Sequence, residues 1–355
     1  MKRYPDIPTP RIAIEPPVYF CPRARGKLKL DGDIRKEFWQ EVPFTEDFVD
    51  ISGRDFPTPR FRTRAKLCWD DENLYIAALL EGNEIWANLT ERDCVIYLDN
   101  DFEIFLDPSA TTHDYLELEM NARNTQWDLM LTRPYRDGGR SVSCWDIKGV
   151  RTAVHIEGKL NDPAADNRFW SAEIILPFRP LMETYSRELN PPELPRCYPP
   201  RHAPRAGEFW RMNFSRVHWT TDVINGKYVK RTGENGEPLP EDNWVWAPTG
   251  LIDIHCPEFW SFVFFTEDGK PLPVPENERR KLALRRLYYA EYAYLREHGR
   301  FTADPAALDI VLPDFPVEIE ITSRLFELSC AAEGGGLVCL RSDGYTYLTR
   351  EVACP

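Results

Sequence analysis

The sequence lacks the features that define several common classes of protein. No stretch approaches the roughly 18 consecutive apolar residues of a membrane-spanning helix, so we expect no membrane partner. The net charge of −13 repels phosphate backbones, and no stripe of Lys and Arg interleaves with the aromatic residues. Both features argue against a nucleic-acid partner.

The sequence also lacks C-x-x-C motifs and the pattern of a secretion signal. The nine cysteines form no C-x-x-C pair, and an odd number cannot all be bridged, which is typical of reduced thiols. Residues 1–6 carry charge, but no apolar segment follows them, as a signal peptide would require. As written, the chain is expected to be soluble and cytoplasmic; a truncated precursor would instead be extracellular or periplasmic.

Apolar residues make up 43% of the 355 residues and aromatic residues 13%, while the 31 prolines predict many turns. Such a chain can bury a sizeable core, and its length suits one large β domain with a small appendage. Short alternating segments separated by turn residues predict an antiparallel, jelly-roll-like β-sandwich. Strands are expected at 27–30, 65–69, 74–80, 101–106, 115–122, 126–132, 150–157, 170–175, 208–217 and 259–265.

From residue 276 onward the sequence predicts a helix and a second, smaller sheet instead of further sandwich strands. Residues 276–298 carry apolar side chains at helical spacing and end at Gly299, which predicts one long helix whose tyrosines pack on the protein itself. Four segments between 317 and 352 predict a β meander. We therefore expect an N-terminal extension at 1–19, a β-sandwich at 20–270 and an α+β unit at 276–355, with a proline-rich surface loop at 190–206.

Two stretches resemble family 9 carbohydrate-binding modules: LCWDDENLYIAALL at 67–80 and DNDFEIFLDPSATTHDYLELEMNARNTQWDL at 99–129. Three later segments, at 170–178, 209–219 and 244–265, are similar to the later strands of that family. The resemblance spans roughly residues 20–268. It implies a non-catalytic sandwich that holds a saccharide between aromatic walls, in carbohydrate catabolism.

The resemblance also implies individual site residues. The first aromatic wall falls at Tyr97, with Trp86 as a nearby substitute, and the carboxylate that binds sugar hydroxyls corresponds to Glu103. An Arg of the family pattern falls near Leu116 or Glu117, which is a departure. The later amide positions fall at Asn213 and Ser215, beside Arg216, and the second wall falls at Ile254 or His255.

A saccharide presents apolar C–H faces and a rim of hydroxyls, so a binding protein needs aromatic surfaces together with carboxylates or amides. We expect Tyr97, Trp127 and Trp246 to stack on the sugar, with Trp86 and Trp219 as further candidates. Glu103, Glu117 and either Asn213 or Arg216 would bind hydroxyls. The expected partner is an oligo- or polysaccharide; the sequence leaves the sugar and the oligomeric state open.

Alternation along a strand would place Asp99, Asp101 and Glu103 on one face, where they need a cation, a polar ligand or solvent. A calcium ion at Asp99 and Asp101 is one of these possibilities, and otherwise no cofactor is expected.

Two alternatives remain open. His255 with Met120, Met130, Met182 or Met212 could bind haem, as in cytochrome-type domains of the same fold. Glu103 with Glu117 or Asp128 could form the carboxylate pair of a glycoside hydrolase.

Overall fold

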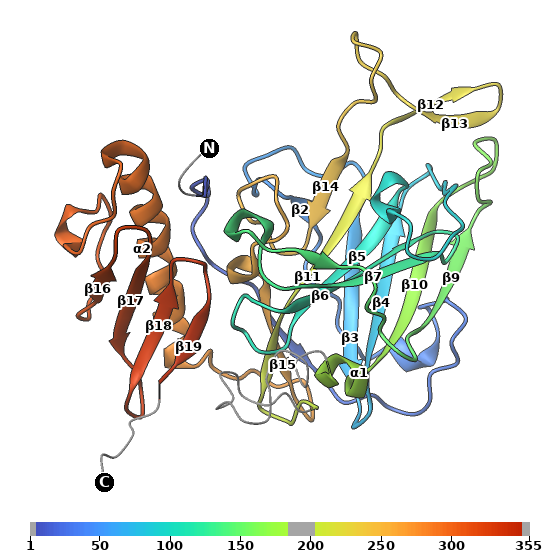
Figure 1. The fold of residues 1–355 in the computed structure, drawn as a ribbon. Helices are drawn as coiled ribbons and strands as arrows, with labels where there is room; N and C mark the ends of the chain where they lie inside the picture. The colour runs from blue at the N-terminus through green and yellow to red at the C-terminus, as the bar shows by residue number, and fades with distance from the viewer. Residues whose placement is uncertain (1–4, 184–202, 350–355) are drawn as a thin grey trace.

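The computed structural model describes residues 5–183 and 203–349 (Figure 1). Two β-sheets pack face to face, and a unit built from one long helix and a third sheet lies beside them, in orange and red (Figure 1). The expected fold class, a mainly antiparallel β-sandwich with a C-terminal α+β unit, is confirmed. No helix in these residues is long and apolar enough to cross a membrane.

The first sheet, here called the large sheet, has nine strands within the described residues, in the order β1-β15-β11-β5-β6-β7-β8, with β14 on β11 and β2 on β14. Its pairs are antiparallel except β1 with β15. The strands are β1 Val18–Cys21, β2 Val49–Asp50, β5 Asp101–Asp107, β6 Tyr115–Asn121, β7 Gln126–Leu131, β8 Ser141–Val142, β11 Phe209–His218, β14 Asp242–Val245 and β15 Ser261–Phe265.

The second sheet, here called the small sheet, has the order β3-β4-β10-β9. Its strands are β3 Thr63–Trp69, β4 Asn73–Glu81, β9 Arg151–Glu157 and β10 Phe169–Pro177, followed by the short helix α1 Phe178–Glu183. The expected β3–β4 hairpin is confirmed. Asp70 Oδ1 closes its turn by accepting hydrogen bonds from the backbone N–H groups of Glu72 (2.8 Å) and Asn73 (2.7 Å).

Side-chain alternation sends one face of each sheet into a shared core. On β5, Phe102, Ile104 and Leu106 point inward and are fully buried. Phe214 of β11 stacks on Phe102 with ring centroids 5.5 Å apart, and Trp246 stacks on Phe214 at 5.6 Å. The residues between them, such as Glu103 and Phe105, therefore point to the outer face of the large sheet.

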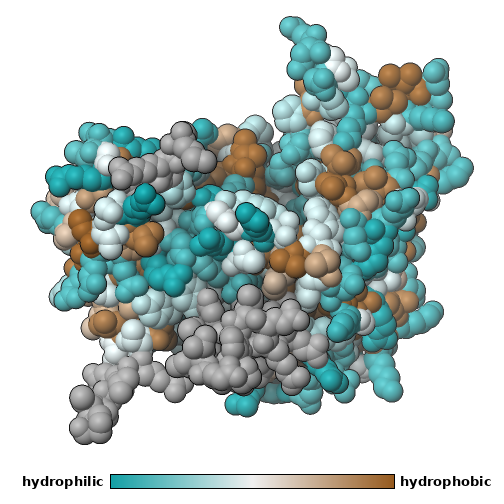
Figure 2. Space-filling view, viewed as in Figure 1, coloured by the Kyte–Doolittle hydropathy of each residue, from teal (hydrophilic) through white to brown (hydrophobic). Residues whose placement is uncertain are grey.

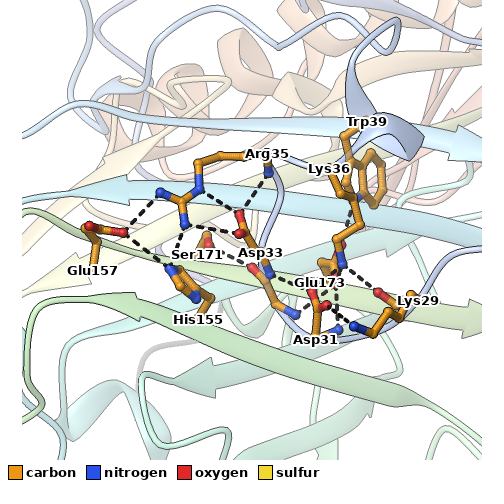
Figure 3. A network of polar contacts seen from close by, with 11 residues as sticks. Lys29, Asp31, Asp33, Arg35, Lys36, Trp39, His155, Glu157, Ser171 and Glu173 are labelled. Atoms are coloured by element: carbon orange, nitrogen blue, oxygen red, sulfur yellow. Dashed lines mark hydrogen bonds and ion pairs between the residues drawn. The ribbon is translucent and has the colours of Figure 1, made fainter.

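The outer face of the small sheet is covered by residues 24–44, a segment that contains the 3-10 turn η1 Glu37–Trp39. Fully buried Glu173 of β10 holds this segment (Figure 3). Its carboxylate accepts hydrogen bonds from Gly32 N (2.8 Å), Lys36 Nζ (2.9 Å) and Trp39 Nε1 (2.7 Å). Gly32 is required here, because its φ is +82° and a Cβ would lie 2.3 Å from the backbone carbon of Val154. The chain itself therefore covers part of this face, and a pocket lined by Phe44, Lys66 and Leu79 stays open there.

The C-terminal unit consists of α2 Glu276–His298 and a four-stranded meander: β16 Glu318–Ile321, β17 Phe326–Ala331, β18 Leu337–Arg341 and β19 Thr346–Leu348. The predicted helix is confirmed, and its residues Tyr288, Tyr289 and Tyr292 are buried in a core shared with the meander. Ile7 lies in the same core, and Arg296 Nη2 donates to Thr9 Oγ1 (2.7 Å). The N-terminal residues thus pack against the C-terminal unit.

Some expectations differ from the structure. Residues 27–30 form no strand; Leu28 and Leu30 instead pack over the small sheet as part of the covering segment. Most of the loop expected at 190–206 and the end of the last meander strand lie outside the described residues. The remaining elements are the hairpin β12 Thr221–Ile224 with β13 Lys227–Lys230 and the 3-10 turns η2 Ile96–Leu98, η3 Tyr135–Asp137, η4 Pro257–Phe259 and η5 Pro305–Ala307.

We expect Glu173→Ala to lower the free energy of unfolding by about 3 kcal/mol or more, because it leaves buried donors of the covering segment without an acceptor. Urea denaturation measures this. The control is Glu41→Ala, whose side chain is 71% exposed and pairs with Arg25 at the surface. Equal effects of the two substitutions would contradict the role assigned to Glu173.

Candidate ligand-binding face

Four carboxylates lie together on the outer face of the large sheet. Asp101 and Glu103 come from β5, and Glu117 and Glu119 come from β6. Each alternates with core residues, so the same period of two that builds the core places all four on the opposite side. All four side chains are buried, Asp101 completely.

The strand register brings these like charges close together. Glu103 lies directly opposite Glu119 across the β5–β6 pair, and Ser215 of β11 lies on its other side. Like charges opposite one another destabilise a sheet unless something neutralises them. Within residues 5–183 and 203–349, no Lys or Arg forms an ion pair with any of the four carboxylates.

Burial and mutual repulsion hold protons on this cluster. Desolvation raises the pKa of Glu103 to about 7, and desolvation with the charge of Glu103 raises the pKa of Glu117 to about 8. The pKa values of Asp101 and Glu119 are raised well above their ordinary range, first by desolvation and then by the Glu103 charge. The cluster is therefore suited to a cation or to ligand hydroxyl groups that donate hydrogen bonds.

The hydrogen bonds of the cluster come from the backbone, from Ser215 to Glu103, and from the contact between Glu117 and Glu119. Glu119 Oε2 accepts from Tyr97 N (3.0 Å), and Asp101 Oδ1 accepts from Val217 N (3.1 Å). Asp101 Oδ2 is buried and has no hydrogen-bond partner among the described residues. Such an orphaned carboxylate oxygen is costly without a ligand.

Two exposed tyrosines flank the carboxylates. Tyr97, in η2, is 41% exposed, and Tyr135, in η3, is 47% exposed. Besides desolvation, the charge of Glu119 raises the pKa of Tyr97, while the charges of Glu117 and Glu119 raise that of Tyr135. The backbone N–H of Tyr97 donates to Glu119, and the ring of Tyr135 lies 4.7 Å from the ring of His255.

Further rings extend this surface. Trp127 of β7 is half-buried, lies opposite Glu119 in the register, and its indole N–H has no partner in the part of the chain that the structure describes. His255 Nδ1 lies 3.0 Å from Tyr115 Oη, and its ring is 4.7 Å from that of Tyr135. Desolvation lowers the pKa of His255 to about 4, so this ring is neutral at pH 7.

The structure thus gathers six of the residues expected from the sequence on one face: Tyr97, Asp101, Glu103, Glu117, Trp127 and His255. Two more belong to it that the sequence reasoning missed. Glu119 shares the period-two alternation of Glu117 and could have been found from it. Tyr135 sits in a turn, where no periodic signal marks the direction of a side chain.

Trp246 and Arg216 lie elsewhere, which corrects the roles expected for them. Trp246 is fully buried between the sheets, and its Nε1 donates to Glu46 Oε2 (2.8 Å). Arg216 points to the same inner side and donates from Nη1 to Thr63 Oγ1 (3.0 Å). A saccharide could reach these groups only by opening the sandwich.

Asn213 points outward, but its amide is already engaged by the backbone. Its Oδ1 accepts from Ala247 N (2.9 Å), and its Nδ2 donates to Ala247 O (2.8 Å). Asn213 therefore fixes the chain after β14 and offers little to a ligand.

Trp86 and Asp99, which were expected to contact a ligand or a metal, instead hold parts of the protein chain in place. Trp86 is buried in a small cluster with Val217 and Trp219. Asp99 Oδ2 accepts hydrogen bonds from the backbone N–H groups of Asn88 and Leu89, both at 2.8 Å, and so holds the loop before η2. Asp99 is thus separate from the group formed by Asp101, Glu103 and Glu119.

The placement of Met120, Met130 and Met212 bears on the haem alternative. All three belong to the core cluster between the sheets, and Met182 packs against that cluster. His255 lies on the outer face, beside Phe105 and Tyr115. The large sheet therefore separates His255 from these methionines.

The C-terminal unit supports the turn that carries Tyr135. Tyr288 of α2 donates a 2.6 Å hydrogen bond to Asp137 Oδ1, two residues from Tyr135. Arg136 forms an ion pair with Glu258 (2.7 Å), and Tyr289 also donates to Glu258. The helix therefore helps to set the position of one aromatic side of the face.

Hydrophilic residues cover much of the surface seen in the view of Figure 2. A separate hydrophobic patch lies on the β12–β13 hairpin at the upper right, where Val223, Ile224 and Val229 are exposed (Figure 2). This patch is distinct from the carboxylate cluster.

Comparison with known proteins points to one family. Residues 30–139 match the model of the family described as carbohydrate family 9 binding domain-like. The match contains β3 to β7 and all four carboxylates, and it confirms the resemblance carried by the motifs at 67–80 and 99–129. No curated protein matches the chain.

Similar solved structures include a candidate carbohydrate-binding protein from Bacteroides uniformis ATCC 8492, at 12% identity and a TM-score of 0.49, covering 71% of this chain and 100% of that chain. A family 9 carbohydrate-binding module from Caldicellulosiruptor kristjanssonii, in complex with glucose, is 14% identical, with a TM-score of 0.41 and coverage of 71% and 98%. The same kind of module from that organism with cellotriose is 16% identical, with a TM-score of 0.38 and coverage of 72% and 98%.

Glu117→Gln should stabilise the protein at alkaline pH. Because the folded-state pKa of Glu117 lies above its unfolded value, the folded state loses stability as the pH rises toward 8. In protein treated with EDTA, we expect the substitution to raise the free energy of unfolding by on the order of 2 kcal/mol at pH 8.5 and to change it little at pH 5.5.

Urea denaturation at the two pH values tests this, with exposed Glu237→Gln as the control. The charged and titratable groups around Glu117 are Asp101, Glu103, Glu119, Tyr97, Tyr115, Tyr135, Glu241 and His255. A variant less stable than the wild type at both pH values would show that the cluster is not repulsive.

Tyr288→Phe should loosen the turn at Tyr135, because Asp137 loses its hydrogen-bond donor from α2. The amides of Gly138 and Gly139, which donate to Tyr135 O and Pro134 O, are expected to exchange hydrogen several-fold faster. Tyr294→Phe, on the same helix, is the control. Unchanged exchange in Tyr288→Phe would mean that the helix does not support the turn.

Proposed function

We propose that this chain binds an oligo- or polysaccharide, without cleaving it, on the face formed by the four carboxylates, Tyr97 and Tyr135. The observation that carries the proposal is the combination of two exposed aromatic rings, those of Tyr97 and Tyr135, with buried hydrogen-bonding groups on the same face. Aromatic rings match the C–H faces of a sugar, and carboxylates bind its hydroxyls. The family match covers the strands that carry these groups.

Within this proposal each residue has a distinct role. Tyr97 and Tyr135 stack on the sugar, with Trp127 and His255 extending the apolar surface. Glu103 and Glu117 accept hydrogen bonds from hydroxyls, and in their protonated forms they can also donate. In this proposal the chain would capture glycans that other proteins degrade, as a part of carbohydrate catabolism.

The glycoside hydrolase remains the second candidate because of one observation. Glu103 and Glu117 share a face and have raised pKa values, as a general acid requires. Asp128 is not available as a partner for them, since it points to the other side of β7 and pairs with Arg92.

A binding assay over a glycan panel tests the proposal, and the panel should include glucose and cello-oligosaccharides of several lengths. We expect one class of glycan to bind. Tyr97→Ala and Tyr135→Ala should each weaken binding by roughly tenfold, because each removes a stacking surface. Phe56→Ala is the matched control, since Phe56 is 39% exposed and lies in a different loop.

Two results would contradict the proposal. Binding that survives both tyrosine substitutions would place the ligand elsewhere. Release of reducing ends from a glycan, abolished by Glu103→Gln in a folded variant, would establish the hydrolase instead.

A further inference from the structure

We propose that Asp101, Glu103 and Glu119 bind one calcium ion on the outer face of the large sheet. Each residue offers a carboxylate oxygen, and the three oxygens all lie within 4.8 Å of one another. Calcium binds oxygen ligands at roughly 2.3 to 2.6 Å, so two ligands on opposite sides of one ion are about 5 Å apart. The three oxygens are therefore close enough together for a single ion to contact all of them.

The second observation is an oxygen that lacks a partner. Asp101 is completely buried, and its Oδ1 is fixed by the backbone N–H of Val217, while Oδ2 has no hydrogen-bond partner in the described residues. A buried carboxylate oxygen without a partner is a strong acceptor that nothing satisfies. An ion within the group would satisfy it.

A second acidic cluster in the same protein differs from this one, because an arginine lies among its carboxylates. The carboxylates of Asp93, Asp128 and Asp146 also lie close together, but Arg92 forms ion pairs with all three. That cluster has a cation supplied by the chain. At Asp101, Glu103 and Glu119, no Lys or Arg of the described residues forms an ion pair; Arg216 acts on Asp101 electrostatically without forming one.

The chemistry of the ligands favours calcium among divalent cations. All three donors are carboxylate oxygens, which calcium prefers, and the group includes no Cys or His, the ligands typical of zinc. Magnesium requires near-ideal octahedral geometry at roughly 2.0 to 2.1 Å and gives up its waters reluctantly, so a site built of three side-chain carboxylates suits it less well.

A calcium ion here would also relieve the repulsion between Glu103 and Glu119. The remaining coordination positions would be filled by water or by ligand oxygens at the face that carries Tyr97 and Tyr135. The inference does not rest on saccharide binding, because the experiment that tests it contains no glycan.

The test uses the full chain after removal of metal with EDTA. Calcium chloride is titrated by calorimetry at pH 7.5, and the thermal unfolding midpoint is followed in parallel. We expect one calcium per chain and a rise of several degrees in the midpoint at about 1 mM calcium, since an ion that binds only the folded state stabilises it. Magnesium chloride is expected to bind at least tenfold more weakly.

Asp101→Asn and Glu119→Gln keep the side-chain shape and each remove one charge, and both should reduce calcium affinity at least tenfold. Asp146→Asn, in the second acidic cluster, is the matched control and should retain the full effect. Each of the first two variants removes a repulsive charge, so the metal-free proteins are expected to be folded. Circular dichroism checks this, and if one variant does not fold, the other serves as the test.

Two results with the wild-type protein would overturn the proposal: no heat and no midpoint shift up to about 10 mM calcium, or tighter binding of magnesium than of calcium. Two results with the variants would also overturn it: a calcium-induced midpoint shift that both site variants retain, or a shift that only Asp146→Asn loses. Stabilisation by glucosamine but not by calcium would assign the carboxylates to an organic cation instead. Failure of the glycan panel with retained calcium binding would leave this inference standing and remove only the saccharide proposal.

Discussion

The crowding of four carboxylates on the outer face of β5 and β6 is the constraint on which the rest of this surface depends. A buried carboxylate needs a proton, a cation or a set of hydrogen-bond donors, and the chain supplies Asp101, Glu103, Glu117 and Glu119 with very few donors. Protons meet this requirement at low pH, which accounts for the raised pKa values. As the pH rises past these values, the same requirement makes the face a binding surface, because a ligand or an ion stabilises the carboxylates that have lost their protons.

The rest of the structure holds this face in place. The small sheet supplies the second half of the core, and Glu173 fixes residues 24–44 over part of its outer side. On the other flank, α2 holds the turn at Tyr135 through Tyr288 and Asp137. The C-terminal unit is thus a structural part of the candidate site, a role that its sequence did not indicate.

The sequence predicted those parts of the site that follow from the alternation of strands. Glu103 and Glu117 lie on regular strands, so their direction was fixed once the strand was recognised. The same rule explains an error: Asn213 and Arg216 are three residues apart on β11, which places them on opposite faces, and only Asn213 points outward. Tyr135 was missed because a turn has no period from which a direction can be derived.

By itself, the sequence determined the sandwich, the long helix and the acidic character of β5 and β6, because these follow from hydrophobic periodicity and local turn chemistry. Tertiary structure alone decided three other features: the register that sets Glu103 opposite Glu119, the burial of Trp246 in the core, and the contact of Tyr135 with His255. Each depends on contacts between residues far apart in the chain. No local pattern encodes such contacts, because they are set by how the sheets pack and by which strands become neighbours.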